Sequence, residues 1–304
     1  MNELLIVGSV ALDSVKTPFG NVKEALGGSA TYASYAASFF TPVRLVGVVG
    51  DDFPVEHVEL LKSRRIDIGG LQTARGKTFR WSGAYEYDLN EAHTLATELN
   101  VFETFKPHIP SAYKKSDFVF LANIDPDLQL SVLDQVDKPK LVACDTMNLW
   151  IRLKPEALKR VIKRVDFLFI NEGEARLFAG MSSLIKAGRL LQSWGPKFVV
   201  IKKGEHGALL FGDKTLFAAP AFPLEDVYDP TGAGDTFAGG FVGYLANSGG
   251  DISDANLRRA VVYGSAMASF TVEKFSLERL KTLSVGQLTE RVRLLKELSH
   301  FDHP

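Results

Sequence analysis

The chain has 304 residues, 46% of them hydrophobic, which is enough to bury the core of one large domain. Lys and Arg number 35 and Asp and Glu 36, so the net charge of −1 favours neither nucleic acid nor an anionic membrane as a partner. We therefore expect a small ligand bound by local contacts. No apolar run approaches the ~20 residues of a membrane span, and the first residues lack the pattern of a signal peptide. These features predict a cytoplasmic protein.

Short apolar runs alternate with amphipathic stretches along the chain. Six short runs are predominantly apolar, as in strands buried on both faces of a parallel sheet: Leu4–Val7, Val43–Val49, Phe118–Leu121, Leu141–Cys144, Phe167–Ile170 and Phe198–Ile201. The stretches between them have helical spacing: Ala30–Phe40, Val55–Leu61, Pro155–Val161, Glu172–Phe178 and Leu184–Trp194. This order predicts an α/β fold with a doubly wound, mostly parallel sheet. The single cysteine, Cys144, lies in one of the strands, where a buried structural role is expected.

Between about residues 73 and 108 the helical spacing disappears. The aromatic residues Phe79, Trp81, Tyr85 and Tyr87 share one parity of the sequence, and polar residues occupy the other. This alternation predicts strands with one aromatic face. An inserted segment of this kind would serve as a lid over a ligand. Packing of the aromatic face on the main domain, or on another subunit in a homodimer, fits the pattern equally well.

A glycine-rich stretch follows the last predicted strand. It begins Asp229-Pro230-Thr231-Gly232-Ala233-Gly234-Asp235. We expect a loop that opens a helix at about Asp235, because apolar residues then recur at helical spacing. Backbone N–H groups at a helix start have no partner within the helix, so those of Gly232, Ala233 and Gly234 can form an anion hole for a phosphate.

Asp235 would stand beside this anion hole. We expect its carboxyl to be ionised at neutral pH, because N–H groups at a helix start favour the charged form. It could then accept the proton of an alcohol that attacks the γ-phosphate. Taken alone, the same residues also fit an ordinary N-cap. From Asp235 onward the chain is mostly helical, with predicted helices at Ala255–Thr271 and Val285–Leu298.

The thirteen residues from Asp229 to Phe241 resemble the C-terminal signature of the PfkB family, the ribokinase-like carbohydrate and nucleoside kinases. The resemblance implies a single ribokinase-like domain over residues 1–304, with small β-strand lid segments at about 11–22 and 73–108. It also implies ATP and Mg²⁺ as cosubstrates and Asp235 as the catalytic base. The sequence contains neither a Walker A motif nor a strand-linked Gly-x-Gly-x-x-Gly, which removes the main support for P-loop and dinucleotide-binding folds.

Other positions resemble the family in the expected order. Asp13 follows the first strand and matches the family aspartate that binds acceptor hydroxyls. Gly27 and Gly28 match the paired glycines against which the acceptor lies. Many sugar kinases have an Asn shortly after this pair, where the present chain reads Thr31-Tyr32-Ala33. This departure argues against a ribokinase-like sugar contact.

Polar residues also follow the later strands. Asn171 and Glu174 match the Asn-x-x-Glu motif of the family, which implies that they help to hold Mg²⁺ through water. Their position fits, since ligands of open α/β sheets bind beyond the carboxyl ends of the strands. Asp145 and Asn148 follow a strand end as well, and are candidates for contact with the acceptor or the phosphate.

The nucleotide contacts are predicted from the stretch that contains Lys202 and Gly204. The family usually has Thr-x-Gly here, next to the nucleotide, and in this chain Lys202 replaces the Thr. The alternative is that the lysines before this glycine are only solvated. The resemblance further implies a monovalent cation beside Asp229 in some family members.

The acceptor is predicted from the lid. Stacking on Phe79, Trp81, Tyr85 or Tyr87, together with hydroxyl contacts at Asp13, favours an adenosine-like nucleoside that is phosphorylated on its hydroxymethyl group. The alternative within the family is a ribose or hexose kinase. A non-catalytic nucleotide sensor is disfavoured, because a binding module would need neither Asp235 nor Glu174.

Overall fold

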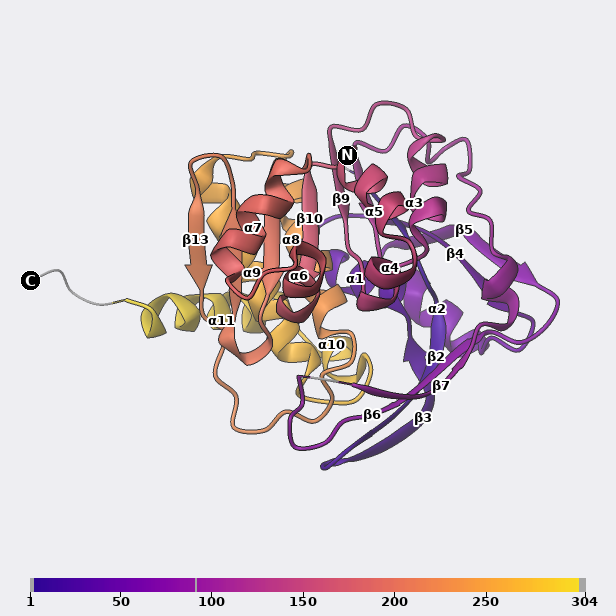
Figure 1. The fold of residues 1–304 in the computed structure, drawn as a ribbon. Helices are drawn as coiled ribbons and strands as arrows, with labels where there is room; N and C mark the ends of the chain where they lie inside the picture. Colours follow the sequence, from indigo (N-terminus) through magenta and orange to yellow (C-terminus); the bar gives the residue numbers. More distant parts are fainter. Residues whose placement is uncertain (1–2, 91, 301–304) are drawn as a thin grey trace, which may run out of the picture.

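The computed structural model describes residues 3–90 and 92–300. Its largest element is a nine-stranded sheet of order β13-β12-β11-β10-β9-β8-β1-β4-β5 (Figure 1). Neighbouring strands from β11 to β5 run parallel, and β12 and β13 extend the sheet antiparallel at one edge. The strands are β1 (Leu4–Val7), β4 (Val43–Gly50), β5 (Ile66–Ala74), β8 (Phe118–Leu121), β9 (Leu141–Cys144), β10 (Phe167–Asn171), β11 (Phe198–Lys202), β12 (Ala208–Phe211) and β13 (Leu216–Ala219).

Helices cover both faces of this sheet, as the uniformly apolar central strands require. In β1, Leu4 and Ile6 belong to the core on one face, and Leu5 and Val7 to the core on the other. The first face packs against α1 (Ser29–Ala37), α2 (Val55–Ser63), α8 (Ala233–Asn247), α9 (Asp254–Thr271), α10 (Glu278–Lys281) and α11 (Val285–Leu298). The second packs against α3 (Pro126–Leu133), α4 (Asn148–Leu153), α5 (Pro155–Ile162), α6 (Glu172–Ala179) and α7 (Leu184–Ser193). The predicted doubly wound α/β fold is confirmed.

The four-stranded lid is a separate sheet of order β3-β2-β6-β7, which lies along the lower edge of the molecule in Figure 1. Its strands are β2 (Ala11–Thr17), β3 (Gly20–Gly27), β6 (Phe79–Ala84) and β7 (His93–Glu98). The first lid hairpin thus continues to Gly27, beyond the expected limit near residue 22. Within the second predicted segment, residues 73–74 end β5 of the large sheet, and Asn100–Thr104 form the short 3₁₀ helix η1.

Every strand and helix predicted from periodicity is present, with ends that differ by a few residues. The prediction from periodicity missed the short helices α3, α4 and α10 and three strands toward the edges of the large sheet, β5, β12 and β13. The edge strand β5 contains Gly69, Gly70 and several polar residues, and β13 is partly exposed, so neither has the continuous apolar run of a central strand. Cys144 is buried, and burial raises the pKa of its thiol, which fits a structural role.

Two kinds of contact fix the position of α8 and of the lid. Side chains added at Gly239 or Gly243 would collide with the backbone of α1, so these glycines allow α8 to pack closely on that helix. The lid is tied to the large domain through Thr17, whose hydroxyl donates to the carbonyl of Tyr228 at 2.8 Å.

In the described residues, no helix is long and apolar enough to cross a bilayer.

Candidate active site

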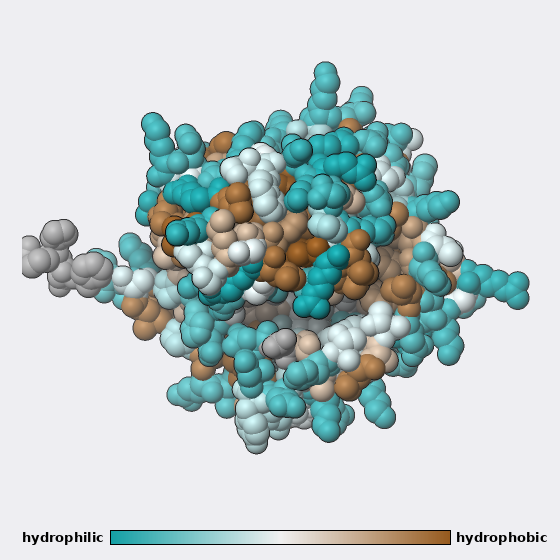
Figure 2. Space-filling model, viewed as in Figure 1, coloured by the Kyte–Doolittle hydropathy of each residue, from teal (hydrophilic) through white to brown (hydrophobic). Residues whose placement is uncertain are grey.

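The candidate site lies where the carboxyl ends of the large-sheet strands face the lid. The surface is hollowed between these two parts of the molecule (Figure 2). Asp145 directly follows β9, Asn171 ends β10 and Lys202 ends β11. The start of α8 reaches the same edge of the sheet, because Asp235 interacts electrostatically with both Asp145 and Lys202. Residues predicted from four separate motifs therefore meet at one place.

The glycine-rich turn places Gly232 in the left-handed region of backbone conformation, which glycine adopts more easily than other residues. Gly232 has a φ of 75°, and a Cβ added there would lie 2.4–2.5 Å from three ring atoms of Tyr32. A side chain at this position would therefore meet both backbone strain and a buried aromatic ring. Helix α8 begins at Ala233, two residues earlier than expected.

The amides of this turn are not equally available to an anion. The N–H group of Ala233 donates to the carbonyl of Pro230 at 3.1 Å. The N–H groups of Gly234 and Asp235 lie in the first turn of α8, where a helix provides no acceptor. They are therefore better placed than Ala233 to bind an anion, at the positive end of the helix dipole.

Asp235 is partly exposed, yet its carboxyl is strongly desolvated. Desolvation, assisted by the charge of Asp145, raises the pKa of Asp235 to about 7, and the ammonium of Lys202 opposes this shift. The expectation of an ionised Asp235 rested on the helix start alone, and burial outweighs that contribution, so the carboxyl is only partly ionised near pH 7. A base with a pKa near 7 is well matched to general-base catalysis.

Asp13 lies close to the same group of acids. Its carboxylate accepts the backbone N–H of Gly28 at the start of α1, and a Cβ on Gly27 would lie 1.9 Å from its Oδ2 atom. Burial raises the pKa of Asp13 to about 7, the Gly28 amide lowers it, and the charges of Asp229 and Asp235 raise it further. Gly27 therefore leaves the space that the Asp13 carboxylate fills beside the candidate base.

Asn171 and Glu174 form a reciprocal capping box at the start of α6. Asn171 Oδ1 accepts the N–H of Glu174, and Glu174 Oε2 accepts the N–H of Asn171, both at 2.8 Å. Glu174 is only 9% exposed, and burial raises its pKa to about 7 while Lys202 lowers it. One carboxylate oxygen is thus engaged in the helix cap. The other is compatible with a water ligand of Mg²⁺, which keeps several waters in protein sites.

The described residues contain no group of three or more His, Cys, Asp or Glu side chains that could ligate a metal directly. A Mg²⁺ ion held through water and nucleotide phosphates does not require such a group. The oxygen donors of Glu174 and Asp145 fit this hard cation chemically.

Gly204 belongs to a turn that the lid contacts. A Cβ on Gly204 would lie 2.1 Å from Asn90 Oδ1, and Asn90 Nδ2 donates to Glu205 Oε1 at 3.5 Å. The tip of the lid therefore closes over the turn that follows β11. Lys202 and Gly204 lie on the large-domain side of this contact.

One of the lid aromatics, Tyr87, departs from the single face that their parity predicted. Strand β6 pairs with β2 without a register shift from Phe79 to Ala84, and Tyr87 lies beyond the end of this strand with 93% of its surface exposed. Phe79 stacks on Phe102 at a ring distance of 5.2 Å, which directs it to the base of the lid. Trp81 pairs with Asp13 across β2 and β6, so both side chains point to the same face of the lid.

Asn148 makes no contact with the acidic residues around Asp235 among the hydrogen bonds of the described residues. It begins α4 with an exposed side chain that makes no hydrogen bond within the described residues. Its placement gives no support to the predicted contact with an acceptor.

Two tyrosines were not predicted as polar groups of the site. Burial raises the pKa of Tyr32 well above its ordinary value, and it raises that of Tyr85 to about 12. The charges of Asp13, Asp229 and Asp235 act on both phenols in the same direction, so both hydroxyl groups face these acids. For Tyr32 the signal was present in the sequence, because it lies in the stretch where the family commonly has Asn.

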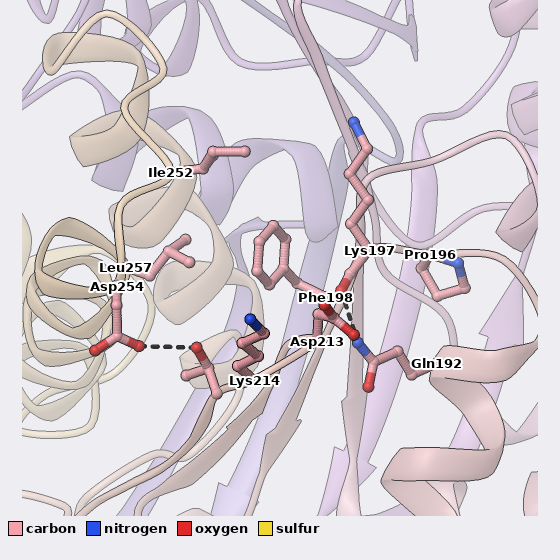
Figure 3. Close-up of a pocket in the computed structure, with 10 residues that line it drawn as sticks. Gln192, Pro196, Lys197, Phe198, Asp213, Lys214, Ile252, Asp254 and Leu257 are labelled. Carbon is pink, nitrogen blue, oxygen red and sulfur yellow. Dashed lines mark hydrogen bonds between the residues drawn. The ribbon is translucent and has the colours of Figure 1, made fainter.

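A second hollow, of about 520 Å³, lies at the opposite end of the strands (Figure 3). Phe198 at the start of β11 and Lys214 in the β12–β13 turn line it, and Thr215 donates to Asp254 at 2.8 Å on its wall. Ligands of open α/β sheets bind at the carboxyl ends of the strands. The hollow therefore is not the site that holds Asp235.

The model of the pfkB family carbohydrate kinases matches residues 2–281. The chain belongs to the PfkB family. A cytidine kinase of Thermococcus kodakarensis is 34% identical to it over 249 residues, which cover 80% of this chain and 88% of that enzyme. The predicted family is thus confirmed, and with it kinase activity as the class of reaction.

Solved structures of the family have the same fold. A nucleoside kinase of Methanocaldococcus jannaschii gives a TM-score of 0.76 at 22% identity, over 97% of this chain and 99% of that chain. A putative ribokinase II of E. coli, solved in complex with ATP and Mg²⁺, gives a TM-score of 0.77 at 16% identity, over 97% of this chain and 100% of that chain. The ribokinase-like fold of this PfkB protein, including its lid, follows from these similarities.

Proposed function

We propose that this PfkB protein is an ATP- and Mg²⁺-dependent nucleoside kinase that phosphorylates the hydroxymethyl group of its acceptor. The observation that carries the proposal is the pairing of Asp13 and Trp81 on one face of the lid, beside Asp235. Asp13 offers a carboxylate to the ribose hydroxyls, and Trp81 offers a flat apolar surface to a base. Similarity to a cytidine kinase supports this choice and makes cytidine, as well as adenosine, the first acceptor to test.

In the proposed reaction Asp235 accepts the proton of the hydroxymethyl group as its oxygen attacks the γ-phosphate of ATP. The amides at the start of α8, chiefly those of Gly234 and Asp235, receive the developing negative charge. Mg²⁺, held through water by Glu174 and Asn171, would neutralise the phosphates when it is bound. Lys202 and Gly204 border the nucleotide on the large-domain side of the lid.

The charges around the acceptor argue against a phosphorylated acceptor. The charges of Asp229 and Asp235 both act on Asp13, and a phosphate group beside these acids would be repelled. Of the lid cations, Arg80 is engaged by Glu24 at 2.7 Å and by Asp52 at 2.8 Å. An uncharged acceptor is therefore favoured.

Two further expectations stay predictions. Both carboxylate oxygens of Asp229 accept backbone N–H groups, those of Thr231 at 2.9 Å and Ser276 at 3.2 Å, and a monovalent cation beside it can be tested by replacing K⁺ in the assay. Strand β7 is exposed at every position, so a homodimer through the lid can be tested by light scattering.

The experiment that tests the proposal is ADP release from ATP and Mg²⁺ across a panel of nucleosides, ribose and hexoses. We expect turnover of cytidine or adenosine, and none of the matching 5′-deoxynucleoside, which lacks the accepting hydroxyl. Trp81→Ala should lower kcat/KM for the nucleoside about 5- to 150-fold, the range measured for aromatic–base stacks. Turnover of ribose or a hexose without any nucleoside would overturn the proposal and leave the sugar-kinase alternative.

A further inference from the structure

Lys202 occupies a central position in the candidate site. It is the last residue of β11, opposite Asn171 of β10, and its side chain is 14% exposed. Its Nζ atom lies 2.5 Å from Asp145 Oδ2, and a Cβ added to Gly234 would lie 3.1 Å from the same Nζ atom. The ammonium group therefore lies between the end of β9 and the glycine-rich turn.

Three acids surround this one cation. Lys202 is the positive charge that opposes the raised pKa values of Asp145, Glu174 and Asp235. Burial by itself would lower the pKa of Lys202, but the three carboxylates outweigh it and raise this pKa. Lys202 is thus an ammonium ion at neutral pH, and it is the cation that the carboxyl groups of Asp145, Glu174 and Asp235 share.

We propose that Lys202 binds the phosphoryl group in transfer and that Asp145 is the positioning residue that holds its ammonium group there. An ammonium has three N–H donors, of which the bond to Asp145 uses one, so two can reach phosphoryl oxygens. The family commonly has a neutral Thr at this place, and Lys202 adds a unit of positive charge. The inference rests on the proposed ATP-dependent reaction but is independent of the acceptor.

The transfer balances without a further reactant. The acceptor oxygen forms a bond to the γ-phosphorus, the bond from that phosphorus to the bridging oxygen of ADP breaks, and the hydroxyl proton passes to Asp235. Lys202 keeps its three protons throughout. Its charge compensates the oxygens of the transferring group, which is where phosphoryl-transfer enzymes need stabilisation.

The competing explanation is that Lys202 only neutralises the buried carboxylate of Asp145. The two roles predict different results for the double variant Lys202→Thr/Asp145→Asn, in which neither charge is left without its partner. We expect Lys202→Thr to lower kcat about 10²–10³-fold, as removal of one transition-state donor does. The double variant should stay within about tenfold of that low kcat. Recovery to within about threefold of the wild-type value would overturn the proposal.

Lys197, which directly precedes β11, provides a matched control for the substitution of Lys202 at the other end of this strand. Its side chain is 65% exposed and pairs with Asp166 at 2.7 Å. Lys197→Thr should leave kcat and both KM values within about twofold of wild type. Thermal melting of all variants checks that each is folded before kinetics are compared.

Nucleotide binding gives a readout that needs no acceptor. In calorimetric titrations with Mg²⁺, Lys202→Thr should weaken ATP at least about tenfold more than ADP, because only ATP carries the phosphoryl group that Lys202 contacts. Equal losses for ATP and ADP would contradict the proposal. If the acceptor is a sugar, the nucleoside assignment fails, but both the binding result and the kcat of the double variant still decide the role of Lys202.

Discussion

Replacement of the candidate base, Asp235→Asn, should abolish most activity and at the same time stabilise the fold at alkaline pH. The site raises the pKa of this carboxyl from its ordinary 3.8 to about 7, so at pH 8 the folded protein carries a charge that is better solvated in the unfolded chain. A shift of about 3 units at about 1.36 kcal/mol per unit sets an upper limit of about 4 kcal/mol. Partial exposure of the carboxyl screens this cost, so we expect a gain of about 1–4 kcal/mol from the asparagine.

The sign of the pH dependence follows from the raised pKa. The stability that Asp235 contributes is fully present below its unfolded pKa of 3.8 and is lost as the pH rises through about 7. The variant should therefore melt several degrees above wild type at pH 8, and the difference should shrink at pH 5. Over the same series kcat should fall about 10²–10⁴-fold, the usual loss without a general base.

The assay is thermal unfolding at pH 5 and pH 8 alongside kcat with the best acceptor. A control is Asp226→Asn, which removes an exposed carboxylate from the preceding loop and should change neither measurement. A variant that melts below wild type at pH 8 would refute the desolvation argument. A kcat within about threefold of wild type would refute the role of Asp235 as base.

Two further substitutions test the rest of the site. Gly232→Ala should destabilise the protein by about 2–5 kcal/mol in denaturant titrations, because αL strain (about 1–2 kcal/mol) adds to overlap with the Tyr32 ring (about 1–3 kcal/mol). Gly286→Ala, whose added Cβ meets only Ser284 Oγ at 3.8 Å, should not destabilise it, and equal stability of the two variants would contradict this explanation. Glu174→Gln keeps an oxygen that can accept the backbone N–H of Asn171, but it removes the negative charge of the side chain. It should therefore raise the Mg²⁺ concentration for half-maximal activity. A Mg²⁺ titration that coincides with wild type would remove Glu174 from the metal site.

The sequence by itself determined the fold class and the main chemical group. Short apolar runs that alternate with amphipathic helical stretches indicate strands buried between two helical layers, and this order predicted the doubly wound sheet. The glycine-rich turn and the helix after it were also predictable from the sequence, because both depend on local backbone geometry around Gly232. The spacing of Asn171 and Glu174 likewise encoded a capping box within one turn of a helix.

Only the tertiary structure decided the environment of these groups. The raised pKa of Asp235 arises from burial and from Asp145, which is distant in the sequence, and the helix-start argument could not include either. Strand β6 ends at Ala84, so Tyr87 lies outside the strand that holds Trp81, although the two residues share one sequence parity. The ion pair of Lys202 with Asp145 joins the ends of two strands 57 residues apart. Such contacts depend on strand order and register, which local periodicity does not specify.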